Sequence, residues 1–181
     1  MLDTLTLGVL GSGDIGMEVA KRANAFGMRV IVCKRDVSTA KPPHVSTMFG
    51  PDQLREFLQE LDYCVNLLPS TAETRALLSG GTLASCSSAV LINVGRGDVT
   101  DEGSVIAALE SGALRHAVLD VFPVEPLPPS SALWHHPAVT VTPHNSAESF
   151  PEDIANAFAA NLALWRSGAA LQNVFDSQRG Y

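Results

Sequence analysis

The chain has 181 residues, of which 46% are hydrophobic and 17% are charged, and its formal net charge at pH 7 is −7. This length is enough for one domain with a substantial core, and the acidic balance argues against the basic face that nucleic-acid binding requires. The first ten residues lack the basic and apolar segments of a signal peptide, and no apolar run approaches membrane-spanning length. We therefore expect neither a membrane nor a nucleic acid as a partner.

The cysteines indicate a reducing compartment. Cys33, Cys64 and Cys86 are odd in number, widely spaced and form no C-x-x-C pair. Cys33 and Cys64 lie in apolar runs, where a free thiol usually behaves as a small buried hydrophobic side chain. Because thiols stay reduced in the cytosol, the sequence predicts a cytoplasmic protein.

The first part of the chain alternates strand and helix signals. The apolar run Thr4–Leu10 predicts a central strand, and apolar residues at helical spacing in Asp14–Phe26 predict a helix that ends at Gly27. The run Arg29–Cys33 predicts a second strand. The polar, proline-containing run Lys34–Pro51 follows, and its length predicts a functional or mobile loop.

The same alternation continues to the end of the chain. The predicted strands are Tyr63–Leu68, Ala89–Val94, Ala117–Val121 and Val139–Thr142. The predicted helices are Asp52–Glu60, Asp101–Ser111 with Thr100 as its N-cap, and the final helix, Pro151–Ser167. Short helical turns are expected at 71–78 and 79–85, and the proline-rich stretch Phe122–Pro137 predicts an irregular connection between two strands.

A glycine-rich motif, Gly11-Ser12-Gly13-Asp14-Ile15-Gly16, lies between the first predicted strand and the first predicted helix. The spacing G-x-G-x-x-G is weak evidence alone, but the flanking strand and helix make it a dinucleotide-binding fingerprint. Gly11 permits the tight turn, Gly13 lets a pyrophosphate approach the backbone, and Gly16 lets the helix pack closely on the strand. Since the N–H groups at the start of the helix would bind the phosphates, we expect residues 1–181 to form a dinucleotide-binding domain.

The order of the predicted elements also indicates the fold. Strands that alternate with helices form βαβ units, and the right-handed crossovers of these units produce a parallel sheet. The predicted fold class is α/β, a Rossmann-type doubly wound parallel sheet with helices on both faces in a three-layer αβα arrangement. A C-terminal helix at about 151–168 and a tail at 169–181 complete the domain. Ligands of such sheets bind beyond the carboxyl ends of the strands.

Two cations follow the second predicted strand, at the position where dinucleotide-binding domains distinguish NAD from NADP. Lys34 and Arg35 end this strand, and Asp36 comes next. Adjacent lysine and arginine side chains suit the 2′-phosphate of NADP, to which the arginine can donate two hydrogen bonds. Asp36 leaves an alternative open, because an acidic residue here accepts hydrogen bonds from the ribose of NAD. The two cations would then be a solvated surface pair. The sequence favours NADP.

Three further polar groups follow later strands. Arg96 stands between Gly95 and Gly97 after the fourth predicted strand, where it suits a planar carboxylate. The alternative for this arginine is a structural salt bridge. Glu125 follows the fifth of the strands and His144 follows the sixth. A carboxylate beside His144 would orient the imidazole and favour its charged form, which would make the histidine a general acid.

No metal site is predicted. The adjacent His135 and His136 lie in the middle of the connection Phe122–Pro137. They have no third ligand nearby at the spacing of a metal site.

Five motifs follow one another along the chain. They are G-S-G-D-I-G at Gly11–Gly16, L-L-P-S-T-A-E-T at Leu67–Thr74, N-V-G-R-G-D at Asn93–Asp98, L-D-V-F-P-V-E-P-L-P at Leu119–Pro128 and V-T-P-H at Val141–His144. This series resembles the cofactor domain of D-isomer-specific 2-hydroxyacid dehydrogenases over nearly the whole chain. Within that family the chain looks most like the glyoxylate/hydroxypyruvate reductase A type, as L-W-x-H-P at Leu133–Pro137 and R-G-Y at Arg179–Tyr181 also indicate.

The resemblance implies an oxidoreductase that transfers a hydride between NADP(H), or NAD(H), and a small 2-oxo or 2-hydroxy acid. Arg96 would hold the carboxylate of the acid and polarise its carbonyl, His144 would donate the proton, and Glu125 would orient the histidine. Asp120 would contact the nicotinamide end. The implied cofactor-binding residues are Gly11, Gly13, Asp14, Ile15, Gly16, Lys34, Arg35, Leu68, Pro69, Thr74, Val94, Gly95, Arg96, Asp120 and His144.

The resemblance also implies parts that this chain lacks. Family members begin with a substrate domain of roughly a hundred residues, whereas this chain begins at the first strand of the cofactor domain. The chain would then be either a fragment or a stand-alone cofactor domain, and it is expected to bind the cofactor with little turnover. Family members dimerise through the cofactor domain, and the apolar connection Phe122–Pro137 with its Trp134 favours a homodimer here as well.

Two other functional classes remain as alternatives. A non-catalytic module that binds or senses NAD(P)(H) needs the glycine motif but none of Arg96, Glu125 and His144, so the presence of all three favours an enzyme. A different Rossmann enzyme, such as an NAD-dependent hydrolase, would need a cysteine or another catalytic group with a partner in the crevice. The sequence offers no such pair.

Overall fold

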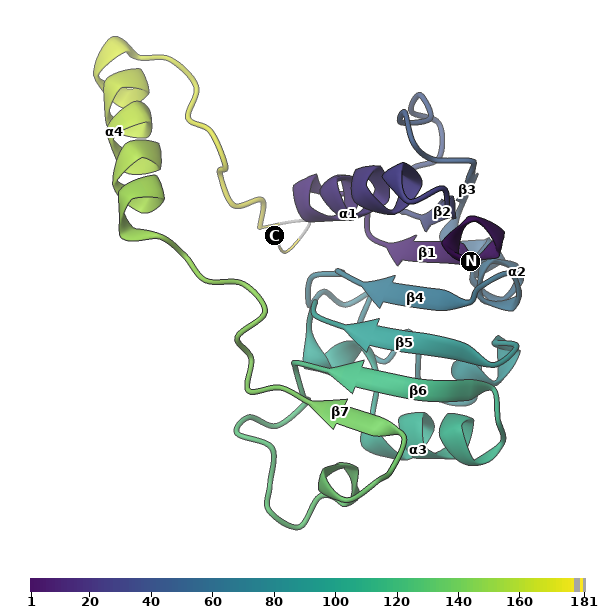
Figure 1. Ribbon diagram of the computed structural model, residues 1–181. Coiled ribbons are helices and arrows are strands. Elements are labelled where there is room, and N and C mark those ends of the chain that lie inside the picture. The colour runs from purple at the N-terminus through teal and green to yellow at the C-terminus, as the bar shows by residue number, and fades with distance from the viewer. Residues whose placement is uncertain (178–179, 181) are drawn as a thin grey trace.

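The computed structural model describes residues 1–177 and 180, and at its centre is a parallel sheet of seven strands in the order β3-β2-β1-β4-β5-β6-β7 (Figure 1). The strands are β1 (Thr6–Leu10), β2 (Arg29–Cys33), β3 (Thr47–Phe49), β4 (Tyr63–Asn66), β5 (Ala89–Asn93), β6 (Leu114–Leu119) and β7 (Val139–Val141). The helices are α1 (Asp14–Ala25), α2 (Leu54–Gln59), α3 (Glu102–Glu110) and α4 (Pro151–Ser167). The chain winds outward from β1 in one direction and from β4 in the other, which confirms the predicted doubly wound Rossmann-type fold.

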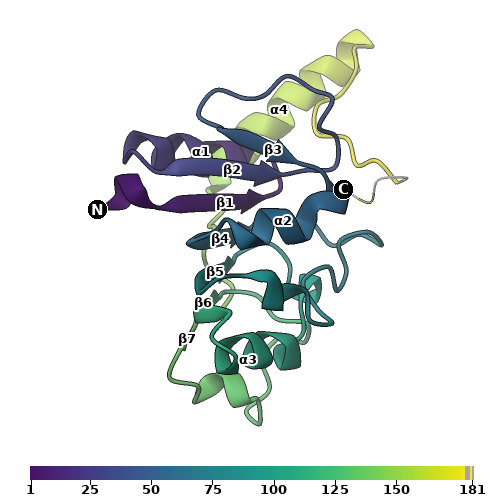
Figure 2. The ribbon, with the colours of Figure 1, turned by 90° about the vertical axis from the view of Figure 1, so that its right-hand side faces the viewer.

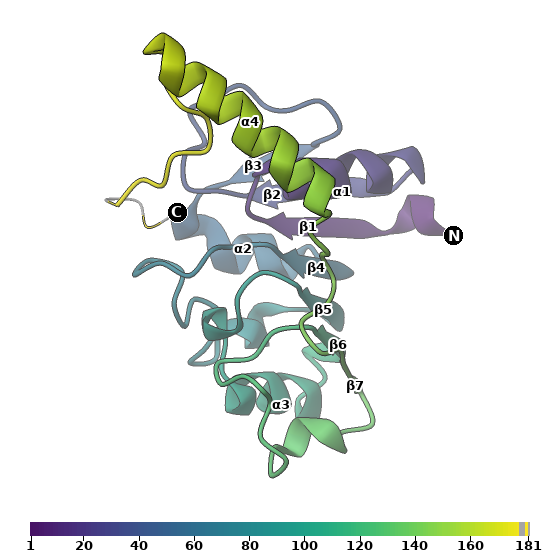
Figure 3. The ribbon, with the colours of Figure 1, turned by 90° about the vertical axis from the view of Figure 1, so that its left-hand side faces the viewer.

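Helices pack on both faces of the sheet (Figures 2 and 3). Consecutive strand residues point to opposite faces, and β2 shows the result. Val30 and Val32 join the apolar cluster that contains Ala20 of α1, whereas Ile31 joins the cluster that contains Phe57 of α2. Both clusters are buried. Helix α1 thus covers one face over β1 and β2, and α2 and α3 cover the other face, while Val118 of β6 stays partly exposed. The carboxyl edge of the sheet remains available for ligands.

The last helix stands apart from the sheet (Figure 1). The bounds of α4 confirm the predicted helix Pro151–Ser167, but none of its residues is buried. Large apolar side chains on and before this helix are exposed, namely Phe150, Ile154, Phe158 and Trp165. Among the residues that the structure describes, no helix combines the length and the apolar character needed to cross a membrane. Arg179 and Tyr181, two of the three residues of the predicted R-G-Y motif, lie outside the described residues.

Three expectations about secondary structure were wrong. The run Lys34–Pro51 is not entirely a loop, because β3 lies within it and pairs with β2. Asp101, not Thr100, caps α3, and its side chain accepts a hydrogen bond from the backbone N–H of Ser104 at 2.8 Å. Strand β6 begins at Leu114 rather than at position 117, since pairing with β5 extends it through polar residues.

The connection after β6 also contains a short regular element. A single turn of 3₁₀-helix at Ala132–Trp134 interrupts the predicted irregular stretch Phe122–Pro137. Leu133 of this turn is buried, while the Trp134 side chain remains half exposed and donates a hydrogen bond from Nε1 to the carbonyl of Pro128 at 2.9 Å. The connection is thus anchored to the domain at its middle.

Candidate functional site

The glycine motif forms the turn between β1 and α1. Gly11 has a φ of +98°, a left-handed conformation that favours glycine, and Gly13 is the N-cap of α1. A Cβ atom on Gly16 would lie 2.2 Å from the carbonyl oxygen of Gly11, so Gly16 is needed for close packing within the turn. A Cβ on Gly13 would meet no atom within 4 Å, so this position faces open space.

The start of α1 fits a phosphate group. No side chain caps this helix, and the first N–H groups of a helix have no acceptor within it. These groups, together with the helix dipole, favour an anion in the open space beside Gly13. Asp14 and Ile15 follow in the first turn, and both are exposed. The residues present therefore fit the diphosphate of a dinucleotide.

The three charged residues after β2 each have a partner within the chain. Lys34 donates a hydrogen bond from Nζ to Thr39 at 2.8 Å, and the carboxylate of Asp36 accepts two hydrogen bonds from Ser38. These bonds from Ser38, together with nearby Lys34, lower the pKa of the Asp36 carboxyl. Arg35 forms an ion pair with Glu73. The Asp36 carboxylate, which the sequence allowed as an acceptor for the ribose of NAD, thus accepts hydrogen bonds from Ser38 in the same turn.

Leu68, Pro69 and Thr74 lie in the segment between β4 and β5. The hydroxyl of Thr74 donates to the carbonyl of Pro69 at 2.5 Å and accepts from the N–H of Thr71 at 2.9 Å. Both threonines are buried, whereas Leu68 and Pro69 are partly exposed. The threonines hold the turn in place, and Leu68 packs against the apolar core. The expected contact of Leu68, Pro69 and Thr74 with the adenine stays a prediction.

Sequence reasoning missed a pair of buried asparagines at neighbouring strand ends. Asn66 ends β4 and Asn93 ends β5, and their side chains are joined by a hydrogen bond of 2.8 Å. The Asn66 side chain also accepts from the N–H of Leu68, and that of Asn93 accepts from the N–H of Gly95. The pair therefore fixes the two loops that border the crevice. The available signal was a polar residue at the last position of two otherwise apolar strands.

The three predicted catalytic residues, Arg96, Glu125 and His144, line one hollow. Nδ1 of His144 lies 2.7 Å from a carboxylate oxygen of Glu125, and the other carboxylate oxygen accepts from the N–H of Phe122 at 2.9 Å. Arg96 donates a hydrogen bond to the carbonyl of Gly95 at 2.8 Å. Arg96 and His144, which two strands separate in the sequence, are thus brought together with Glu125 at the carboxyl edge of the sheet.

The electrostatics favour an ionised Glu125 at neutral pH. Partial burial acts to raise the pKa of this carboxyl, but hydrogen bonds from His144 and from the N–H of Phe122 outweigh burial, so the pKa is lowered. The carboxylate is consequently available to accept a hydrogen bond from the N–H at Nδ1 of His144. His144 has a φ of +52°, an uncommon backbone conformation for a residue with a side chain.

Asp120 holds the backbone that carries His144. Its carboxylate is buried and accepts hydrogen bonds from the hydroxyl of Thr142, the N–H of Asn145, and both the N–H and the hydroxyl of Ser146. Burial acts to raise the pKa of Asp120, but these hydrogen bonds outweigh it and bring the pKa to about 2. Both oxygens thus have partners within the chain. The expected contact of Asp120 with a nicotinamide stays a prediction.

The three thiols and the two adjacent histidines, His135 and His136, do not line this hollow. Cys33, Cys64 and Cys86 are buried, free thiols, and burial raises the pKa of Cys33 and of Cys86 to about 11. Neutral, buried thiols are poor nucleophiles. His136 accepts a hydrogen bond at Nδ1 from the N–H of Ala138. Within the described part of the chain, no group of three His, Cys, Asp or Glu side chains is arranged to hold a metal ion.

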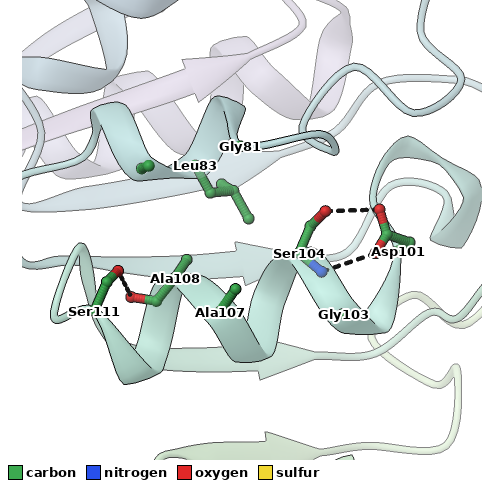
Figure 4. Close-up of a pocket in the computed structure, with 9 residues that line it drawn as sticks. Gly81, Leu83, Asp101, Gly103, Ser104, Ala107, Ala108 and Ser111 are labelled. Atoms are coloured by element: carbon green, nitrogen blue, oxygen red, sulfur yellow. Dashed lines mark hydrogen bonds between the residues drawn. The ribbon is translucent and has the colours of Figure 1, made fainter.

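A second hollow lies between α3 and the 3₁₀-turn Thr82–Ser85 (Figure 4). Its polar side chains are Asp101, Ser104 and Ser111. Both carboxylate oxygens of Asp101 accept hydrogen bonds from Ser104, and the hydroxyl of Ser111 donates to the carbonyl of Ala108. These groups stabilise the two ends of α3 and offer no catalytic arrangement, so we place the functional site at the hollow that contains His144.

The chain is similar to known proteins over almost its whole length. The family model for the NAD binding domain of D-isomer specific 2-hydroxyacid dehydrogenases matches residues 1–146. A glyoxylate/hydroxypyruvate reductase A from Serratia proteamaculans is 38% identical over 180 residues, which are 99% of this chain and 57% of that protein. A reductase of the same name from Klebsiella pneumoniae is 37% identical with the same coverage. The chain therefore spans a little over half the length of these curated relatives.

Solved structures agree with this result. A D-isomer specific 2-hydroxyacid dehydrogenase from Xanthobacter autotrophicus, solved with NADPH, matches with a TM-score of 0.94 and 38% identity over 99% of this chain and 74% of that one. An NADPH-dependent glyoxylate/hydroxypyruvate reductase from Sinorhizobium meliloti, solved with NADP and sulfate, matches with a TM-score of 0.90 and 35% identity over 98% of this chain and 57% of that one. On its fold, its motifs and these matches, the chain belongs to the D-isomer specific 2-hydroxyacid dehydrogenase family and carries the NAD-binding domain of that family.

Proposed function

We propose that this chain is the cofactor-binding domain of a reductase that uses NADP(H), and less readily NAD(H), to interconvert a small 2-oxo acid and its 2-hydroxy acid. The substrates proposed are glyoxylate and hydroxypyruvate, since relatives that are named for these activities match the chain over nearly all its length. The observation that carries the proposal is the 2.7 Å contact of His144 with Glu125 in the hollow that Arg96 also lines. The direct test is NADPH oxidation with either acid, compared between wild type and His144→Gln in a chain joined to a substrate domain.

Each of the three residues has a distinct task in the proposed reaction. Arg96 would bind the carboxylate of the 2-oxo acid through its planar guanidinium and place positive charge beside the carbonyl. Glu125 would accept a hydrogen bond from the N–H at Nδ1 of His144 and stabilise the imidazolium. His144 would donate the proton of Nε2 to the carbonyl oxygen as a general acid. When bound, a reduced nicotinamide supplies the hydride that completes the reduction to a 2-hydroxy acid.

Other residues would hold the cofactor in this crevice. The diphosphate would lie at the turn that Gly11, Gly13, Asp14, Ile15 and Gly16 form. Leu68, Pro69 and Thr74 would border the adenine, and Val94, Gly95 and Asp120 would lie toward the nicotinamide. The support is positional, because all of these residues follow the carboxyl ends of β1, β4, β5 or β6.

The proposed preference for NADPH rests on Lys34 and Arg35. Two charge-assisted contacts to a 2′-phosphate are worth at least about 1.5 kcal/mol, so NADPH is expected to bind about tenfold or more tightly than NADH. Calorimetric titration of the purified chain with both cofactors measures this ratio. Arg35→Ala should narrow it, whereas Arg22→Ala, which removes an exposed arginine of α1, should leave it unchanged. Equal affinities, or tighter NADH, would refute the preference.

We also propose that the chain forms a homodimer through the connection after β6. Val124 and Trp134 of this connection expose apolar surface, with exposed fractions of 63% and 48%, and exposed apolar side chains favour association. Light scattering at micromolar concentration should give the mass of a dimer. Trp134→Glu should shift the population toward monomer, while Phe26→Glu, at an exposed apolar side chain just after α1, should not. A wild type that is monomeric throughout this range rules the dimer out.

A cytoplasmic location is proposed from the thiols. Cys33, Cys64 and Cys86 are free and buried, as is usual in a reducing compartment. Fractionation of the source cells should recover the chain with cytoplasmic markers, and recovery with an external fraction would contradict the proposal.

The proposed domain organisation follows from the length of the match. The chain spans 57% of the curated relatives, and we propose that residues 1–181 form one dinucleotide-binding domain whose C-terminal helix and tail complete it. A separate substrate domain, as the relatives' additional length suggests, would form the other wall of the crevice. Exposed apolar residues of α4 are suited to pack against such a wall.

A further inference from the structure

An ion pair crosses the carboxyl edge of the sheet at the end where the proposed 2′-phosphate would bind. A terminal nitrogen of Arg35 lies 2.6 Å from a carboxylate oxygen of Glu73. Arg35 follows β2, whereas Glu73 belongs to the segment after β4, and both strands are neighbours of β1 in the sheet (Figure 1). The pair therefore spans the carboxyl end of β1, where the glycine turn begins.

The position of Glu73 is set by a rigid turn. Thr71 and Thr74 flank it, are buried, and are joined by hydrogen bonds between the N–H of Thr71 and the hydroxyl of Thr74 and between the N–H of Thr74 and the carbonyl of Thr71. The Thr74 hydroxyl also donates to the carbonyl of Pro69. The Glu73 carboxylate thus projects from an anchored backbone, while its side chain is 68% exposed and remains accessible to solvent and ligand.

A carboxylate and a phosphate are alternative partners for the same guanidinium. Both are oxyanions that accept charge-assisted hydrogen bonds from arginine, often two at once. A 2′-phosphate that approaches Arg35 must therefore compete with Glu73, and the two anions also repel each other at short range. A cofactor without the 2′-phosphate has no such competition at this arginine.

We propose that Glu73 is a specificity-determining residue that occupies the 2′-phosphate position in the cofactor-free protein and thereby weakens NADPH binding selectively. This inference rests on the proposed binding of NADP(H) at Lys34 and Arg35. Glu73 lowers the preference that these cations create, so that the cofactor is released more readily than two unopposed cations would allow. Exposed ion pairs are weak and are screened by salt, so the effect is moderate and decreases at high ionic strength.

The test is calorimetric titration of four forms of the purified chain: wild type, Glu73→Gln, Arg35→Ala and the double variant. Glu73→Gln preserves the size of the side chain and should tighten NADPH binding about threefold to tenfold, with NADH changed by less than about twofold. In the Arg35→Ala background the same substitution should have little effect, because the competing guanidinium is gone. Glu18→Gln, which removes a paired carboxylate of α1, is the matched control and should change neither affinity.

The outcomes separate this inference from the proposed function. If wild type prefers NADPH and Arg35→Ala removes that preference, but Glu73→Gln leaves NADPH affinity unchanged or weaker, the role of Glu73 is wrong and the NADP(H) site stands. An equal gain from Glu73→Gln with and without Arg35 also overturns it, since the effect would then be general charge repulsion. If wild type binds both cofactors equally and Glu73→Gln creates a preference for NADPH, the competition by Glu73 is supported. No preference in either form refutes both.

Discussion

The 181-residue chain by itself is expected to bind NADPH yet reduce hydroxypyruvate and glyoxylate far more slowly than a complete reductase. The proposed catalytic residues Arg96, Glu125 and His144 line one hollow, but the side chains of His144 and Glu125 remain 54% and 34% exposed. Positioning of the 2-oxo acid and exclusion of water account for several kcal/mol of barrier, so their loss lowers the rate by several orders of magnitude. The measurement is NADPH oxidation by the purified chain with either acid. Its kcat/KM should fall far below the value of about 10⁴ M⁻¹s⁻¹ that a competent enzyme would exceed.

The control restores the second wall of the crevice. This chain matches 57% of the Serratia relative. The part of that relative that the chain does not match would be fused to the N-terminus of the chain. The fusion should recover turnover, and His144→Gln in the fusion should abolish most of the gain. Turnover of the unfused chain near that of a complete enzyme would show that the substrate site lies entirely within these residues, contrary to our assignment.

Alanine at Gly13 and alanine at Gly16 should impair different properties of the protein, although the two positions are only about one helical turn apart. Gly13→Ala should fold normally, since φ at Gly13 is −72° and a Cβ there meets no atom within 4 Å. It should nevertheless weaken NADPH and NADH binding at least about tenfold, because the methyl group enters the space that a pyrophosphate needs. Titration of the folded variant with both cofactors measures the loss.

Gly16→Ala should instead reduce stability. Its Cβ would lie 2.2 Å from the carbonyl oxygen of Gly11, and backbone atoms cannot move away without shifting the whole turn. We expect a loss of about 3 kcal/mol or more in the free energy of unfolding, measured by denaturant titration. Normal stability of Gly16→Ala, or unfolding of Gly13→Ala, would mean that the turn is packed differently from the structure described here.

Local sequence patterns were sufficient for most of the fold. The bounds of α4 and β2 were predicted correctly, because helical spacing and a β-branched run act over neighbouring residues. The glycine motif was identified in the same way, since its turn, helix start and close packing depend on adjacent positions. Placement of Arg96, Glu125 and His144 near one another followed from a general rule, because the carboxyl ends of parallel strands share one edge of the sheet.

Contacts between distant segments required the tertiary structure. Strand β3 has only three residues and is defined by pairing with β2, and the partner of Arg35 proved to be Glu73, on the far side of β1. The buried Asn66–Asn93 pair likewise joins two strands. Such contacts depend on which loops the sheet order brings together, and no local pattern encodes that order.

Asp120 shows the same division most clearly. The sequence by itself determined that a carboxylate follows β6, at the edge where ligands bind. Only the tertiary structure decided that this carboxylate is buried and accepts four hydrogen bonds from the segment Thr142–Ser146, which carries His144. The physical reason is that a buried anion must be matched by donors, and these donors come from a strand end that is adjacent in space but remote in sequence.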